Sequence, residues 1–123
     1  MKKLLALILD ATLLLGCAVT AQAANARASE AASVLYDLAL FQGTGTNADG
    51  TPDFSLDRAA KRAEGVTLLV RLLGIDEETL KHASDAPFTD VPGWAKPYVN
   101  FAYENDLTKG VSADKLGAND AVT

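Results

Sequence analysis

Apolar residues recur at intervals of three and four in three stretches of the chain, which is the spacing of one face of an α-helix. The first stretch predicts a helix over residues 30–41, with Ser29 as its N-cap and an end near Gly43. The last stretch predicts a helix near residues 92–105, followed by a loop. The apolar positions of these two helices are Ala31, Val34, Leu35 and Leu38, and then Trp94, Tyr98, Phe101 and Ala102.

The middle stretch, AAKRAEGVTLLVRLLG at residues 59–74, has the most regular apolar pattern. It predicts a helix that is buried on most of its circumference and ends at Gly74. A short acidic helix is expected next, from Asp76 to about His82. The stripe of the middle helix consists of Val66, Leu69, Val70 and Leu73, widened by Leu68 and Leu72.

The polar stretch GTGTNADGTPD, after the first helix, reads as a loop of turn-forming residues. Phe54 and Leu56 follow it, and we expect both to return to the core. Asn47, Asp49 and Asp53 suggest a calcium loop, but three oxygen ligands fall short of the six to eight that calcium takes. We therefore interpret the stretch as turns and predict no metal site.

The chain carries an internal correspondence at an offset of 67 residues. Residues 36–43 align with 103–110, and Tyr, Leu and Gly coincide within them. Phe54 corresponds to Leu116 once the extra residues of the first loop are allowed for. The order is thus helix, long loop, helix, linker, helix, long loop, and a further buried helix is expected after Thr123.

The first 23 residues have the pattern of a secretory signal peptide. Two lysines precede an apolar run over 4–15, and small residues end in Ala21-Gln22-Ala23. The run is shorter than the roughly 20 apolar residues that span a bilayer, so no membrane span is predicted. Gly16-Cys17 leaves lipidation at Cys17 as a less favoured alternative to cleavage after Ala23.

The chain beyond this leader is acidic. Residues 24–123 contain nine basic and 15 acidic residues, because two of the 11 basic and one of the 16 acidic residues lie in the leader, and their net charge is −6. Such a surface repels nucleic acid at long range, so no nucleic-acid partner is predicted. Without Cys17 no thiol remains for disulfides or catalysis.

Several motifs together resemble the S-layer homology family. FTDV at 88–91 and WAKPYVNFAYENDLTKGVSA at 94–113 resemble the opening half of one repeat. KRAEGVTLLVRLLG at 61–74 resembles the closing half of the preceding repeat, whose signature is Thr-Arg-Ala-Glu before an apolar helix. The resemblance covers residues 29–123 and implies an all-α fold, a helical repeat bundle with helix, long loop and helix in each repeat, truncated in the second repeat.

The resemblance also implies a role. Such repeats dock exported proteins onto the wall of Gram-positive bacteria by binding a secondary cell-wall polysaccharide, often pyruvylated, in grooves shared with neighbouring repeats. Arg62 matches the signature Arg that helps bind the acidic sugar, and Glu64 matches the signature Glu. Lys61 and Arg58 would add to a local cationic spot on the acidic surface, and a guanidinium or free helix-start N–H groups suit a carboxylate.

Lys61 departs from the signature, because Thr-x-x-Glu is a capping box and lysine cannot accept the N–H bond that threonine accepts. Asp57 could cap instead and start the helix earlier, which would move Arg62 into the second turn. Arg62 could equally be a solvated helix residue. Trp94 could stack on a sugar ring, although at helical spacing with Tyr98 it is more often a core residue.

The residues show no catalytic constellation: the lone His82 has no nucleophile pattern around it, and no cofactor motif is present. We therefore predict a secreted wall-anchoring module of the cell wall or S-layer that is not an enzyme. Two alternatives are a targeting module of a cell-wall enzyme whose catalytic domain lies beyond Thr123, and a self-associating envelope scaffold. The predicted segments are a signal peptide (1–23), a linker (24–28), a first repeat (29–74), a second linker (75–87) and the first half of a second repeat (88–123).

Overall fold

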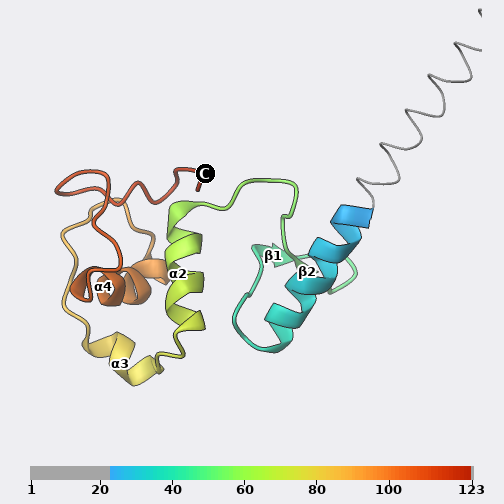
Figure 1. The fold of residues 1–123 in the computed structure, drawn as a ribbon, viewed down its shortest axis with the longest axis horizontal. Helices are drawn as coiled ribbons and strands as arrows, with labels where there is room; N and C mark the ends of the chain where they lie inside the picture. The colour runs from blue at the N-terminus through green and yellow to red at the C-terminus, as the bar shows by residue number, and fades with distance from the viewer. Residues whose placement is uncertain (1–22, 123) are drawn as a thin grey trace, which may run out of the picture. The chain divides into compact units, whose positions relative to one another are not determined.

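The computed structural model describes residues 23–122, which form helices and loops with one short two-stranded sheet. The chain divides into two compact units, Met1–Leu56 and Asp57–Thr123 (Figure 1). The predicted signal peptide, apart from Ala23, and the alternative lipid anchor at Cys17 lie outside the described residues. The mainly helical class is confirmed, and the small sheet is an addition to the predicted all-α fold.

A helix over residues 23–37 opens the described part of the first unit. It includes residues 24–28, where the sequence suggested a linker, because this stretch is rich in alanine, the strongest helix former. Ser29 therefore lies inside the helix rather than at its N-cap, and its carbonyl accepts a hydrogen bond from the Ser33 hydroxyl at 3.0 Å. The helix ends before residue 41, and Ala39 has a left-handed backbone with φ of 57°.

The polar loop folds into a hairpin. Strand β1 (Gly45–Thr46) pairs antiparallel with strand β2 (Pro52–Asp53). The Asp49 carboxylate accepts bonds from the Thr51 hydroxyl at 2.6 Å and the Thr51 N–H at 3.0 Å, and these bonds, the hydroxyl first, lower the pKa of Asp49. The loop oxygens are thus used to close a turn, and the described residues contain no group of three or more potential metal-ligating side chains.

Aromatic side chains join this hairpin to the preceding helix. Phe54 stacks on Phe41 with ring centroids 5.6 Å apart and meets Tyr36 edge-on at 6.0 Å. Phe54 does pack back against these rings but is only half-buried, and Leu56 is exposed, so the expectation that Leu56 returns to the core was wrong. The apolar positions Val34 and Leu38 are also exposed, because one helix and a hairpin supply too little surface to cover the whole stripe.

The second unit contains helix α2 (Arg62–Leu72), helix α3 (Glu77–His82), the 3₁₀ turn η1 (Gly93–Ala95) and helix α4 (Lys96–Glu104) (Figure 1). Both α2 and α3 pack against α4. Val66 of α2 touches both apolar clusters of the unit. One cluster contains Ala63, Phe88, Val91, Ala95, Val99, Leu116 and Ala118, and the other contains Val70, Leu80 and Ala102.

Helix α2 buries one face rather than most of its circumference. Leu69, Leu72 and Leu73 are exposed, so the prediction of near-complete burial was wrong. Burial is confined to the side that faces α4 and the C-terminal loop. On the α4 side, the Arg71 guanidinium lies 4.9 Å from the centre of the Tyr98 ring and donates a 3.2 Å bond to its hydroxyl, which ties the two helices together.

The loop after α4 has the same local backbone as the loop after the first helix. Ala39 and Asp106, 67 positions apart, have φ values of 57° and 56°, and Gly43 and Gly110 have 73° and 74°. Each of these glycines precedes a residue whose N–H donates to a carbonyl further on, at Asp53 in the first loop and at Lys115 in the second. The two loops therefore share the conformation that their aligned sequences suggested.

Candidate ligand-binding site

Helix α2 begins at Arg62, with Lys61 as its N-cap in an extended conformation. The alternative start capped by Asp57 is therefore wrong, and Arg62 keeps its place in the first turn. The Lys61 side chain makes no cap bond, as expected for lysine. The Glu64 carboxylate does accept the Lys61 N–H at 2.8 Å, which is the half of a capping box that does not need threonine.

Glu64 also pairs with Arg58. The two guanidinium NH₂ groups donate to the two carboxylate oxygens at 2.6 and 3.0 Å, in a bidentate arrangement. The Arg58 hydrogen bond is the main cause that lowers the pKa of Glu64, and the Lys61 N–H adds to it against some desolvation. Arg58 and Glu64 thus neutralise each other, so they contribute little net charge to a ligand.

The C-terminal segment 118–122 crosses the start of α2. The N–H groups of Arg62 and Ala63 donate to the carbonyls of Asp120 and Ala118 at 2.9 and 3.1 Å. In return, the Val122 N–H donates to the carbonyl of Ala60 at 2.8 Å. The expectation that these helix-start N–H groups bind an anion was wrong for Arg62 and Ala63, because the chain's own carbonyls occupy them.

Asp90, from the FTDV motif, holds this segment in place. Its carboxylate accepts three backbone N–H bonds, from Leu116 at 2.8 Å, Gly117 at 2.8 Å and Ala118 at 3.0 Å. Desolvation acts to raise the pKa of Asp90, but the three N–H bonds outweigh it and the pKa is lowered. The carboxylate therefore stays ionised at neutral pH and fixes the segment that covers the α2 start.

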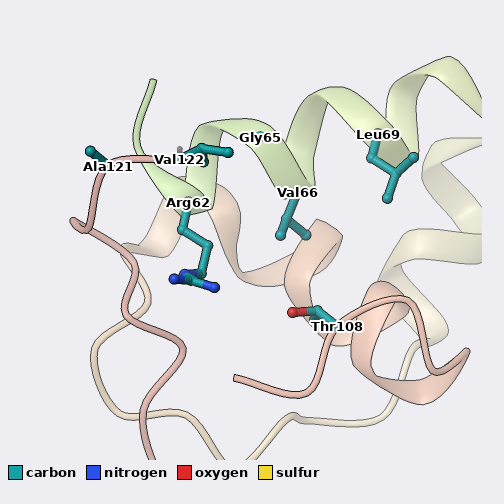
Figure 2. Close-up of a pocket in the computed structure, with 7 residues that line it drawn as sticks. All are labelled: Arg62, Gly65, Val66, Leu69, Thr108, Ala121 and Val122. Atoms are coloured by element: carbon teal, nitrogen blue, oxygen red, sulfur yellow. The ribbon is translucent and has the colours of Figure 1, made fainter. Parts of the chain in front are cut away.

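A pocket of about 390 Å³ lies between α2, the segment 118–122 and the loop after α4 (Figure 2). Its lining is apolar or small except for the Arg62 guanidinium and the Thr108 hydroxyl. The Arg62 side chain extends from the start of α2 toward the side where Thr108 lies (Figure 2). The lining residues are Arg62, Gly65, Val66, Leu69, Thr108, Ala121 and Val122.

One donor of the Arg62 guanidinium is buried and unsatisfied among the described residues. Its Nε atom is buried and has no hydrogen-bond partner among the described residues. A buried donor without a partner costs roughly 1–3 kcal/mol, and more when the group is charged. Native structures rarely leave a buried donor without a partner, so the unsatisfied Nε sets Arg62 apart from the other residues that line the pocket.

The other predicted site residues lie outside this lining. The Lys61 ammonium donates to the Asn119 side chain at 3.2 Å. Trp94 lies in η1 with 55% of its surface exposed, so the preference for a core position was wrong. Its exposed ring could stack on a sugar, but it does not line the Arg62 pocket.

Of the seven lining residues, sequence reasoning assigned only Arg62 to a binding site. It placed Val66 and Leu69 in the apolar stripe of the helix, and it assigned no role in a site to the remaining four: Gly65, Thr108, Ala121 and Val122. Gly65 was within reach, because a glycine inside a strong helical pattern is unusual. The other three lie far from Arg62 in the chain and meet it only through the fold. Together, the seven lining residues offer one cation and mainly apolar walls. This arrangement suits the binding of an anion that carries an apolar group, rather than catalysis.

Comparisons with known proteins bear on the family that the chain resembles rather than on single site residues. Residues 87–123 match the family model of the S-layer homology domain, which confirms the resemblance over that segment. Over 77 residues, 60% of this chain, the sequence is 34% identical to a protein of Thermoanaerobacter kivui named "Cell surface protein". The chain spans about 10% of the length of that relative. No solved structure matches the chain.

The S-layer homology match indicates a module that anchors proteins at the cell surface. Within residues 23–122, no helix combines the length and the apolar character needed to cross a membrane.

Proposed function

We propose that this chain anchors an exported protein to the bacterial cell wall by binding a pyruvylated secondary wall polysaccharide in the Arg62 pocket. The observation that carries the proposal is that Arg62 lines a pocket with mainly apolar walls while its buried Nε has no hydrogen-bond partner among the described residues. A pyruvyl ketal joins a carboxylate and a methyl group on one carbon. The carboxylate suits the guanidinium, and the methyl suits the apolar walls.

The geometry favours recognition at short range rather than by overall charge. The net charge of residues 24–123 is −6, which repels an acidic polymer at a distance. Arg58 is paired with Glu64, so Arg62 supplies the contact. In this proposal Arg58 and Glu64 stabilise the start of α2, while Lys61 and the exposed Trp94 contact the polymer outside the pocket.

Binding to purified wall polymer tests the proposal. The full-length protein, Arg62→Ala and Arg62→Lys would be compared on pyruvylated polymer and on the same polymer after removal of the pyruvyl groups. We expect the wild type to prefer pyruvylated polymer, and Arg62→Ala to lose at least tenfold in affinity, as truncation of a charge-assisted bond does. Arg62→Lys should recover little, because an ammonium cannot form the bidentate contact.

The controls separate this function from its alternatives. Arg58→Ala removes a neighbouring cation outside the pocket and should weaken polymer binding far less than Arg62→Ala does. Equal binding with and without pyruvyl groups would contradict the proposed ligand. A chain that self-associates but binds neither polymer would favour the alternative of an envelope scaffold. Polymer binding is compatible with the other alternative, in which this module targets a cell-wall enzyme.

A further inference from the structure

Thr108 lies in the loop after α4, at the position that Phe41 holds in the loop after the first helix, 67 residues earlier. The two loops make the same backbone hydrogen bond at this position. The Phe41 N–H donates to the Leu35 carbonyl at 3.1 Å, and the Thr108 N–H donates to the corresponding Ala102 carbonyl at 3.3 Å. The backbone therefore accepts either a large aromatic or a small polar side chain here, and what the side chain contacts decides between them.

The side chains at these two positions have different surroundings. The Phe41 ring stacks on Phe54 with centroids 5.6 Å apart. The Thr108 side chain instead lines the Arg62 pocket, and its hydroxyl makes no hydrogen bond within residues 23–122. Figure 2 shows this hydroxyl on the side of Thr108 that is turned toward Arg62. Where Phe41 packs, Thr108 thus presents a free donor and acceptor at the pocket wall.

Only two of the side chains that line the pocket are polar, those of Arg62 and Thr108. In ligand sites with mainly apolar walls, a few such groups fix the orientation of the ligand and its specificity. The guanidinium suits a carboxylate but does not distinguish the groups that can carry one. A neutral hydroxyl adds nothing to the attraction of a negative charge, and it suits a neutral hydroxyl on the same ligand.

We propose that Thr108 determines which sugar the pocket accepts, by forming a hydrogen bond with a free hydroxyl of the sugar that carries the carboxylate. This inference rests on the proposed function and adds a contact that the carboxylate does not supply. Arg62 recognises the acid, and Thr108 recognises the sugar beside it. A ligand without a hydroxyl at that place covers Thr108 without bonding to it, and a site built to bond a hydroxyl rejects such an analogue.

Thr108→Val tests the inference, because valine keeps the shape of threonine and removes the hydroxyl. In the full-length protein, Thr108→Val should lower the affinity for pyruvylated polymer by about tenfold, since the ligand hydroxyl loses its partner. Thr108→Ser keeps the hydroxyl and should recover most of the affinity. The thermal unfolding midpoint of Thr108→Val should match that of the wild type. Thr46→Val is the matched control, because Thr46 is exposed in β1 and does not line the pocket, and its affinity should be unchanged.

A modified ligand connects the effect to a sugar hydroxyl. The smallest pyruvylated fragment released from the polymer would be compared with the same fragment after O-methylation of its free hydroxyls. Methylation should weaken binding to the wild type by about tenfold or more. Thr108→Val should weaken binding of the unmethylated fragment by about tenfold and of the methylated fragment by less than about twofold, because the bond is already lost there.

The outcomes separate this inference from the proposed function. Polymer binding that needs Arg62 but is unchanged in Thr108→Val overturns the role of Thr108 and leaves the anchor standing. An equal loss in Thr108→Val and Thr108→Ser also overturns it, because the hydroxyl is then not what acts. Equal weakening of both fragments by Thr108→Val excludes a sugar hydroxyl as the partner. Absence of wild-type binding to pyruvylated polymer overturns the inference and the proposed function together.

Discussion

At the scale of single residues, Gly110 shows where this chain depends on glycine. Its φ of 74° lies in the left-handed region, and a Cβ there would come within 2.5 Å of both the Lys115 carbonyl oxygen and the Phe88 ring. The Val111 N–H that follows donates to the same Lys115 carbonyl at 2.9 Å. Gly110 thus allows the loop after α4 to turn back onto the core, which Phe88 helps to form.

Gly110→Ala should destabilise the second unit by about 2 kcal/mol or more, because left-handed strain and the steric conflict add. The measurement is the urea midpoint of unfolding. Gly93→Ala is the control: its Cβ would meet no atom within 4 Å, so a change within about 0.5 kcal/mol is expected. Equal effects of the two substitutions would contradict the role of Gly110.

At the scale of elements, the start of α2 is held by contacts that replace the missing side-chain bond of its N-cap residue. Lys61 offers no side-chain acceptor, and a cation at a helix N-terminus is unfavourable. Glu64 accepts the Lys61 N–H and holds Arg58. The segment 118–122 accepts the N–H bonds of Arg62 and Ala63. Helix α2 therefore starts at Arg62 through tertiary contacts rather than through its own cap.

Lys61→Thr should stabilise the protein by about 1 kcal/mol, because threonine completes the capping box with Glu64 and removes the unfavourable charge. The bond from Lys61 to Asn119 is lost, but it lies on the exposed surface and contributes little. Chemical denaturation of Lys61→Thr beside Lys61→Ala measures the difference between them. No gain of threonine over alanine would show that the tertiary contacts already satisfy the helix start.

Helix positions could largely be predicted from the sequence, because apolar spacing and stop signals are local. The helix predicted to run to about His82 ends there as α3, and Gly74 follows α2 as expected. Which face of each helix is covered by other parts of the protein could not be predicted. Leu69 and Trp94 fit a buried stripe by spacing, yet both are exposed, because coverage depends on which other elements lie against them.

At the scale of the whole second unit, the pocket depends on segments far apart in the chain. The sequence singled out Arg62, through its place in the signature, but Ala121 and Val122 lie about 60 positions away and meet α2 only in the fold. No periodicity reports such contacts. The one sequence signal for the role of residues 117–122 was the internal correspondence of Phe54 with Leu116. It aligns the residues after Leu116 with the residues between Phe54 and α2.

Asp90 ties the FTDV motif to residues 116–118 through its carboxylate. Because a carboxylate can be protonated, this contact is sensitive to pH. The pKa of Asp90 is lowered from its ordinary value of 3.8. A carboxylate with a lowered folded-state pKa contributes stability that is fully present above its unfolded-state pKa and is lost as the pH falls through its folded-state pKa. Loss of the charge weakens the three N–H bonds to residues 116–118, which lead directly into the pocket wall at Ala121 and Val122.

Asp90→Asn should therefore lower the stability of the protein at pH 7 by roughly 1–2 kcal/mol, since an amide gives up charge-assisted bonds at a partly exposed site. Urea midpoints at pH 7 and at pH 3 measure this, and the gap between wild type and variant should narrow at the lower pH. Asp114→Asn is the control, because within residues 23–122 its carboxylate accepts only one bond, the exposed one from the Ser112 hydroxyl. Affinity for pyruvylated polymer at pH 7 should fall in Asp90→Asn alone, because the loosened segment no longer closes the pocket beside Arg62. A gap that persists unchanged at pH 3 would show that Asp90 acts through packing rather than through its charge.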